Sequence, residues 1–147
     1  MKKIEIIGIA VRTSNNNGDS ARDIPALWSK FIGEGIAQQI PNKVDETIYC
    51  LYTDYEKDHT LPYTTILGCQ VSTSEKVPEG MVAKTIELNN HQIFTAKGSI
   101  NEGMVFNEWL KIWNSDLDRA YTTDFEVYGE RAADVNIAEV DIFIALN

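Results

Sequence analysis

A carboxylate and nearby aromatic side chains recur together in a four-residue phrase that occurs twice. Residues 53–56 read Thr-Asp-Tyr-Glu, and residues 123–126 read Thr-Asp-Phe-Glu. Further tyrosines lie close to both copies, with Tyr49 and Tyr52 beside the first and Tyr128 beside the second. The faces of aromatic rings attract cations, and a carboxylate adds charge selectivity. If these side chains meet beside a cleft, they have the chemistry to hold an organic cation.

The role of Glu126 depends on which face of its strand it occupies. Alternate residues of a strand share a face, so Glu126 and Tyr128 point one way, and Phe125 and Val127 the other. If Phe125 and Val127 form the core, Glu126 faces solvent and has no special role. If Glu126 and Tyr128 face the helices instead, a carboxylate lies in an aromatic cleft. The spacing alone slightly favours the solvent-exposed alternative.

Two tryptophans could form the walls of such a cleft. Trp109 and Trp113 are four residues apart on a predicted helix, so they are neighbours on one face. Packing in the core is the more common role of such a pair. An indole N–H needs an acceptor when it is buried, however, and two adjacent indoles facing an acidic, tyrosine-rich strand would form a slot for a flat ligand. A buried carboxylate without a partner is unfavourable until a cation arrives, so the slot would select cations.

Other reactive residue types give weaker signals. His59 and His91 lie in predicted turns and have no partner at metal-binding or triad spacing, so we expect both at the surface. Cys50 and Cys69 lie in strand-like segments, where two buried free thiols are favoured over a disulfide. The sequence contains no GxSxG or GxGxxG motif. We therefore expect no metal and no cofactor, and catalysis starts at a disadvantage because no nucleophile–base pair is evident.

Composition excludes several classes of protein. The chain has 147 residues, 44% of them hydrophobic, which indicates one globular domain. It carries 13 Lys and Arg against 22 Asp and Glu, a net charge of −9, and it has no basic patch for direct binding to nucleic acid. There is no secretory signal, and no apolar run approaches the roughly 20 residues of a membrane span. These features predict a cytoplasmic protein.

The elements that must position these residues follow from hydropathy and turn signals. Content of β-branched and aromatic residues predicts strands over residues 4–12, 47–56, 63–73, 82–88, 93–97, 120–129 and 135–146. A first helix is predicted to start at Asp23, with Pro25 in its first turn, and to stop by Gly33. A second helix is predicted from Asn101 to about Leu117.

The order of these elements repeats. Each half carries a strand, a helix with tryptophan and then two strands, one of which holds the acidic, aromatic phrase. The repeat predicts one βαββ unit used twice in an α+β domain with an antiparallel sheet. We expect a single domain over residues 1–147, with halves at approximately 1–75 and 82–147.

An ordered set of residues spread over nearly the whole chain carries a family resemblance. The set consists of residues 8–15 (GIAVRTSN), Leu27-Trp28 with Phe31, residues 48–56 (IYCLYTDYE), Leu67-Gly68, Trp109 with Ile112-Trp113, Arg119 with Tyr121, residues 124–128 (DFEVY) and residues 140–142. In these residues the chain resembles the effector-binding proteins related to integron-cassette proteins. They belong to the gyrase-inhibitor-like and multidrug-binding domain superfamily, which also supplies the ligand-sensing halves of some AraC-type and MerR-type regulators.

The resemblance implies a fold and a site. The fold would be two βαββ modules with pseudo-two-fold symmetry, in which two main helices flank a cleft over a curved antiparallel sheet. The ligands of the family are typically lipophilic aromatic cations, and Glu126 corresponds to its cleft acid. The aromatic walls would come from Trp109 or Trp113, from Tyr49 or Tyr52, and from Tyr128. The first copy of the phrase, residues 54–56, runs into a charged turn and is expected to act as scaffold.

These expectations favour a small-molecule binding domain that acts as a sensor or a transcription-regulator-like module. Regulator relatives carry a DNA-binding domain ahead of this module, and none is expected here because the module begins at residue 4. The expected partner is a cationic or amphiphilic small molecule, and a protein partner or a homodimer is also compatible with the sequence. Two alternatives stay open: a hydrolase of reactive small molecules that uses the cleft glutamate and tyrosine, and an acidic protein-interaction or inhibitor module.

Overall fold

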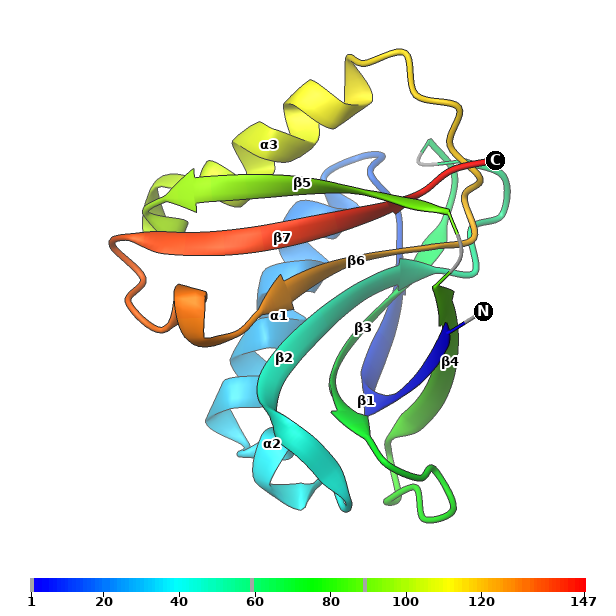
Figure 1. Ribbon diagram of the computed structural model, residues 1–147, viewed down its shortest axis with the longest axis vertical. Helices are drawn as coiled ribbons and strands as arrows, with labels where there is room; N and C mark the ends of the chain where they lie inside the picture. Colours follow the sequence, from blue (N-terminus) through cyan, green and yellow to red (C-terminus); the bar gives the residue numbers. More distant parts are fainter. Residues whose placement is uncertain (1, 59, 89) are drawn as a thin grey trace.

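The computed structural model describes residues 2–58, 60–88 and 90–147, and in these residues seven strands form one antiparallel sheet. The strands are β1 (Lys2–Thr13), β2 (Lys43–Thr53), β3 (Tyr63–Val71), β4 (Val82–Leu88), β5 (His91–Gly98), β6 (Thr123–Tyr128) and β7 (Ala138–Ala145). The helices are α1 (Asp19–Gly33), α2 (Ile36–Gln39) and α3 (Met104–Trp113), with 3₁₀ turns η1 (Ile100–Glu102) and η2 (Glu130–Ala132). The sheet is strongly curved (Figure 1). The predicted α+β class is confirmed.

The order of strands in the sheet reflects the duplication. β1, α1, β2 and β3 follow one another in the first half, and β5, α3, β6 and β7 do so in the second. The sheet order is β4-β1-β3-β2-β6-β7-β5. Outward from the central β2–β6 pair, β3 and β1 follow on one side, and their counterparts β7 and β5 follow on the other. This is the arrangement that pseudo-two-fold symmetry requires. β4 lies outside the pattern, next to β1 at the edge of the sheet.

The repeated phrase lies at the β2–β6 seam, but its two copies are not equivalent. Thr53 is the last residue of β2 and pairs with Thr123, the first residue of β6. Their hydroxyl oxygens are 2.8 Å apart. Asp54 then leaves the sheet with a φ of 50°, whereas Asp124 continues along β6. The prediction that the first copy lies wholly within a strand is wrong, because the left-handed backbone of Asp54 ends β2.

Both main helices differ from their predicted bounds. α1 begins at Asp19, after Gly18 in the left-handed region, so Pro25 lies inside the helix and not in its first turn. Because proline has no N–H, the carbonyl of Ala21 lacks the helical hydrogen bond that residue 25 would otherwise donate. Ala21 is exposed, so solvent can supply a hydrogen bond instead. Asp23 does not cap the helix; its carboxylate instead accepts a hydrogen bond from Thr13. α3 ends at Trp113, four residues before the predicted end.

The remaining elements agree with the sequence apart from their ends. The other strands lie where they were predicted, with ends that shift by four residues at most. α2 was not predicted; it lies between the predicted end of the first helix at Gly33 and the predicted start of the next strand at residue 47. Among the described residues, no helix has both the length and the apolar character needed to cross a membrane.

Each face of the sheet carries its own core. On the helix-covered face, Leu27 and Phe31 of α1 pack with Leu67 of β3, and Ile112 of α3 packs with Ile142 of β7. On the opposite face the curved sheet covers itself, and that core consists of Ile4, Ile6, Leu51, Ile66, Ile86 and Phe125. Burial of each such side chain stabilises the fold by about 1.5–3 kcal/mol.

A pair of glycines allows β1 and β3 to approach closely. Gly8 and Gly68 are directly opposite each other in the ladder. A Cβ atom on Gly8 would lie 1.9 Å from the carbonyl oxygen of Leu67, and one on Gly68 would lie 2.2 Å from that of Ile7. No other residue type fits either position without moving the backbone.

Candidate ligand-binding site

A cavity of about 1090 Å³ lies between α1 and α3, over the helix-covered face of β2 and β6. Its lining is largely apolar and aromatic, with side chains such as Ile24 and Trp28 from α1 and Val105 and Phe106 from α3. Among the described residues that line it, Glu126 and Arg119 are the charged ones. The volume and the apolar lining are typical of a pocket for a drug-sized organic molecule.

Glu126 lies at the floor of this cavity and is 2% exposed. Its Oε2 accepts hydrogen bonds from the hydroxyl of Tyr52 at 2.8 Å and from the indole Nε1 of Trp109 at 2.7 Å. Its Oε1 accepts one from the hydroxyl of Tyr128 at 2.6 Å. Phe125 packs in the opposite core. Glu126 therefore faces the helices, which is the alternative that spacing alone placed second.

The electrostatics of Glu126 are set by two opposing effects. Burial raises the pKa of the Glu126 carboxyl group, and the hydrogen bonds from Tyr128, Trp109 and Tyr52 partly offset this rise. Burial also raises the pKa of the Tyr52 and Tyr128 hydroxyls well above the usual value, so both stay protonated and can donate. No described cationic side chain forms an ion pair with Glu126. Neutral donors thus hold the carboxylate without neutralising it.

Both predicted tryptophans line the cavity. Trp109 is 7% exposed and packs edge-on against Tyr52, with ring centroids 5.3 Å apart. The ring centroid of Trp113 lies 6.1 Å from that of Trp109 and 5.9 Å from that of Phe106. Phe106 is 57% exposed. The sequence left open which indole faces the cleft. In the structure Trp109 belongs to the floor and Trp113 to the wall beside Phe106.

The predicted site residues Tyr52 and Tyr128 line the cavity, but Tyr49 does not. Tyr49 packs against Phe125 on the opposite face of the sheet, and its hydroxyl donates to Gln70 at 3.4 Å. The assignment of Tyr49 to the site is therefore wrong. The reason lies in strand geometry, because Tyr49 and Tyr52 are three residues apart and point to opposite faces.

Several lining residues were not predicted. Trp28 contacts the ring of Tyr128 edge-on, with ring centroids 4.9 Å apart, although it was noted only as part of the family resemblance. Tyr63 closes another side and donates to Asn15 at 2.6 Å. Tyr55 also lines the cavity, although the first copy of the phrase was expected to be scaffold only. No sequence signal distinguishes these aromatic residues from ordinary core residues.

A buried network joins the two copies of the phrase. The carboxylate of Asp124 accepts hydrogen bonds from the hydroxyl of Tyr55 at 2.5 Å, from Nη2 of Arg119 at 2.8 Å and from the backbone N–H of Ala145 at 2.8 Å. The guanidinium of Arg119 also lies 4.4 Å from the ring centroid of Tyr121. Arg119 and Asp124 form a compensated pair, so Glu126 gives the cavity its net negative charge.

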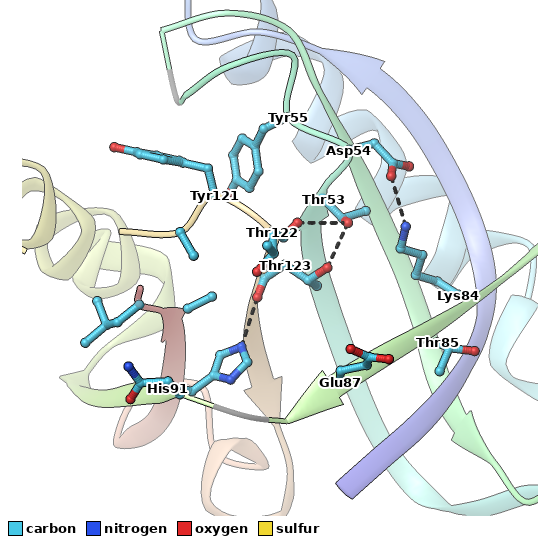
Figure 2. Close-up of a pocket in the computed structure, with 14 residues that line it drawn as sticks. Thr53, Asp54, Tyr55, Lys84, Thr85, Glu87, His91, Tyr121, Thr122 and Thr123 are labelled. Atoms are coloured by element: carbon cyan, nitrogen blue, oxygen red, sulfur yellow. Dashed lines mark hydrogen bonds and ion pairs between the residues drawn. The ribbon is translucent and has the colours of Figure 1, made fainter. Parts of the chain in front are cut away.

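A smaller cavity of about 440 Å³ lies on the other side of Tyr55. Figure 2 shows Tyr55 and Tyr121 on one side of it and Lys84 on the other. Lys84 forms an ion pair with Asp54 at 2.9 Å, and the hydroxyls at the seam bond to each other. Because these groups are already paired, this cavity is the weaker candidate for a charged ligand.

Of the described histidine and cysteine residues, none lines the main cavity. His91 begins β5, and its ring lies half-buried against Phe125, so the prediction of a surface turn is wrong. His59 is outside the described residues. Cys50 and Cys69 are buried free thiols, as predicted, and burial raises the pKa of both. No group of three or more His, Cys, Asp or Glu side chains in the described part of the chain could hold a metal ion.

Two solved structures share this fold over the full length of the chain. One is an integron cassette protein from the mobile metagenome of Vibrio cholerae, which is 30% identical, with a TM-score of 0.76 over 100% of this chain and 92% of that one. The other is the protein SAV2435 bound to tetraphenylphosphonium, with a TM-score of 0.81 over 100% of this chain and 90% of that one. It is 14% identical, so its similarity concerns the fold alone.

Sequence comparisons agree with the structural ones. The candidate transcriptional regulator YobU of Bacillus subtilis (strain 168) is 29% identical over 143 residues, which cover 95% of this chain and 89% of that protein. The family model described as integron-associated effector binding protein, Cass2, matches residues 1–146. The chain therefore belongs to the family of integron-associated effector-binding proteins.

Proposed function

We propose that this chain is a sensor or transcription-regulator-like domain that binds lipophilic aromatic cations in the cavity between α1 and α3. One observation carries the proposal. Glu126 is a buried carboxylate at the floor of an aromatic cavity, and no described cationic side chain pairs with it. An entering cation would supply the missing positive charge, while the aromatic walls would supply the contact area.

The charges around the cavity favour a cation over an anion or a neutral molecule. Arg119 is compensated by Asp124, which leaves the charge of Glu126. Two unit charges about 4 Å apart attract each other by about 4 kcal/mol where the effective dielectric constant is about 20. Ring faces such as those of Trp109 and Trp113 would add up to about 2 kcal/mol for a desolvated cation. Together these contributions can offset the cost of removing a diffuse organic cation from water.

Relatives support the proposal at the level of ligand class. The family is described as effector-binding, and the structurally similar SAV2435 was solved with tetraphenylphosphonium, a lipophilic aromatic cation. The relative YobU bears the name of a candidate transcriptional regulator. On this basis we propose that residues 1–147 form one effector-binding domain and that it acts in the cytoplasm.

Titration with tetraphenylphosphonium tests the proposal. Quenching of the fluorescence of Trp28, Trp109 and Trp113, which all line the cavity, or calorimetry would report binding, and neutral triphenylphosphine oxide serves as the ligand control. We expect Glu126→Gln to weaken binding of the cation by about tenfold to a hundredfold and to leave the neutral compound little affected. Glu56→Gln is the matched control, because Glu56 is the exposed glutamate of the other phrase copy. Unchanged affinity of Glu126→Gln for the cation would refute the role of the charge.

A hydrolase of reactive small molecules is the second candidate. The raised pKa of Glu126 favours it, because a carboxylate with a raised pKa is a better general base. Against it, three hydrogen bonds already occupy the carboxylate oxygens and lower its basicity. Turnover of an electrophile panel that is lost in Glu126→Ala and kept in Glu56→Ala would favour hydrolysis over binding.

A further inference from the structure

Arg119 has two hydrogen-bond donors that nothing in the described structure uses. The residue lines the main cavity, and its side chain is 4% exposed. Its Nη2 donates to Asp124. Its Nε and Nη1 are buried and have no hydrogen-bond partner. Buried donors are nearly always satisfied in folded proteins, so two on one guanidinium call for an explanation.

The surroundings explain why Asp124 does not satisfy these donors. A guanidinium usually meets a carboxylate through two parallel hydrogen bonds. Here one oxygen of Asp124 accepts the backbone N–H of Ala145, and the other is shared between Tyr55 and Arg119. The rings of Tyr121 and Trp109, at 4.4 and 5.8 Å, attract the positive charge but offer no lone pair to an N–H. The fold therefore holds Arg119 in place and leaves two of its donor nitrogens without a partner, on a residue that lines the main cavity.

The position of Arg119 relative to Glu126 is fixed by one indole. The Nε1 of Trp109 donates to Glu126, while the ring of Trp109 lies under the guanidinium of Arg119. The carboxylate and the spare donors thus flank the same side chain. Glu126, Trp109 and Arg119 all line the main cavity, so a ligand that fills it lies beside all three.

We propose that the ligand of this cavity carries, besides its positive centre, a carbonyl or carboxylate oxygen that accepts hydrogen bonds from Arg119. The positive centre lies toward Glu126, and the oxygen lies about the width of one indole away. This inference rests on the proposed cation binding and narrows its ligand class. Purely hydrocarbon cations fill the cavity but leave the Arg119 donors unsatisfied.

A matched pair of ligands tests the inference on the unmodified protein. The probes are (4-carbamoylbenzyl)triphenylphosphonium and (4-isopropylbenzyl)triphenylphosphonium, which share their cation and have substituents of similar shape. Because a hydrogen bond from a charged donor commonly changes affinity by about tenfold or more, we expect the carboxamide to bind about tenfold more tightly. The isopropyl group is more apolar, so an apolar wall without donors would favour it instead. The 4-carboxybenzyl analogue distinguishes an anionic from a neutral acceptor.

Variants then assign the preference to Arg119. The double variant Arg119→Met with Asp124→Asn removes the guanidinium without leaving an unpaired buried carboxylate, and circular dichroism checks its fold. We expect it to bind the isopropyl probe at least as tightly as the carboxamide. If the unmodified protein binds both probes equally, or prefers the isopropyl probe, the inference is overturned while cation binding stands. If it binds neither probe nor tetraphenylphosphonium, the proposed function fails, and this inference fails with it.

Discussion

Replacing Tyr128 by Phe removes one hydroxyl group from the floor of the main cavity. That hydroxyl donates to Oε1 of Glu126 at 2.6 Å, whereas the two other donors, Tyr52 and Trp109, both reach Oε2. The ring stays in place, held by its edge-on contact with Trp28. The substitution therefore leaves Oε1 of a buried carboxylate without the donor that it has in the unmodified protein.

The size and pH dependence of the effect follow from the charge on Glu126. A hydrogen bond to a charged group contributes about 1.5–3 kcal/mol, so the free energy of unfolding should fall by that amount when Glu126 is ionised. The bond from Tyr128 lowers the pKa of Glu126, against the rise caused by burial, so its loss raises this pKa further. When the pKa of a carboxyl group is higher in the folded than in the unfolded state, the group contributes stability to the protein that is fully present below the unfolded-state pKa. That contribution is lost as pH rises through the folded-state pKa. The cost of Tyr128→Phe is thus largest above the raised pKa of Glu126 and shrinks as pH falls through it.

Urea unfolding at a series of pH values measures this difference, and Tyr49→Phe is the matched control. Tyr49 lies on the neighbouring strand, faces the opposite core and donates a longer bond of 3.4 Å to the neutral Gln70. Its loss should cost about 1 kcal/mol or less, independently of the charge on Glu126. Equal and pH-independent losses in the two variants would refute the reasoning, because they would show that Tyr128 does not stabilise an ionised carboxylate.

Two further predictions concern the ligand and the sheet. Affinity for tetraphenylphosphonium should fall as pH drops through the raised pKa of Glu126, since protonation removes the charge; calorimetry at several pH values measures this, and a flat profile would contradict it. Gly8→Ala should prevent folding or strongly destabilise the chain, because its Cβ would lie 1.9 Å from a backbone oxygen. Gly33→Ala is the control, because the added Cβ would meet no neighbouring atom within 4 Å. This variant should raise the free energy of unfolding by about 0.4–1 kcal/mol. Thermal unfolding of both variants checks the pair.

The fold could be predicted largely because local patterns and global arrangement agree. Leu27 and Phe31 of the first predicted helix pack against the sheet, and the strand segments pair in the duplicated order. Helix and strand ends were less predictable, because tertiary contacts decide them. Asp23 looks like a helix cap but is engaged by Thr13, and the strand signal through Glu56 is cut short by the backbone of Asp54.

The site could be predicted only in part, because a local pattern does not reveal which distant side chains meet. Glu126 and Trp109 were found as residue types suited to a cation, yet their hydrogen bond joins β6 to α3 across 17 residues of sequence. Arg119 was noted only as part of a family resemblance. Its importance depends on how the oxygens of Asp124 are shared with Ala145 and Tyr55, which the three-dimensional structure alone specifies.

The position of Glu126 at the seam also bears on which residue can lie opposite it in the neighbouring strand. The cavity lies over the β2–β6 pair, where both main helices contribute to its walls. The residue directly opposite Glu126 in that pair is Cys50, which shares its face of the sheet. A second carboxylate at that position would meet Glu126 at close range, and two buried like charges would drive one of them to its protonated form. A small thiol with a raised pKa stays neutral there, and it donates to the same Tyr52 hydroxyl that holds Glu126. The cysteine opposite Glu126 thus leaves the Glu126 carboxylate without a like-charged neighbour across the seam.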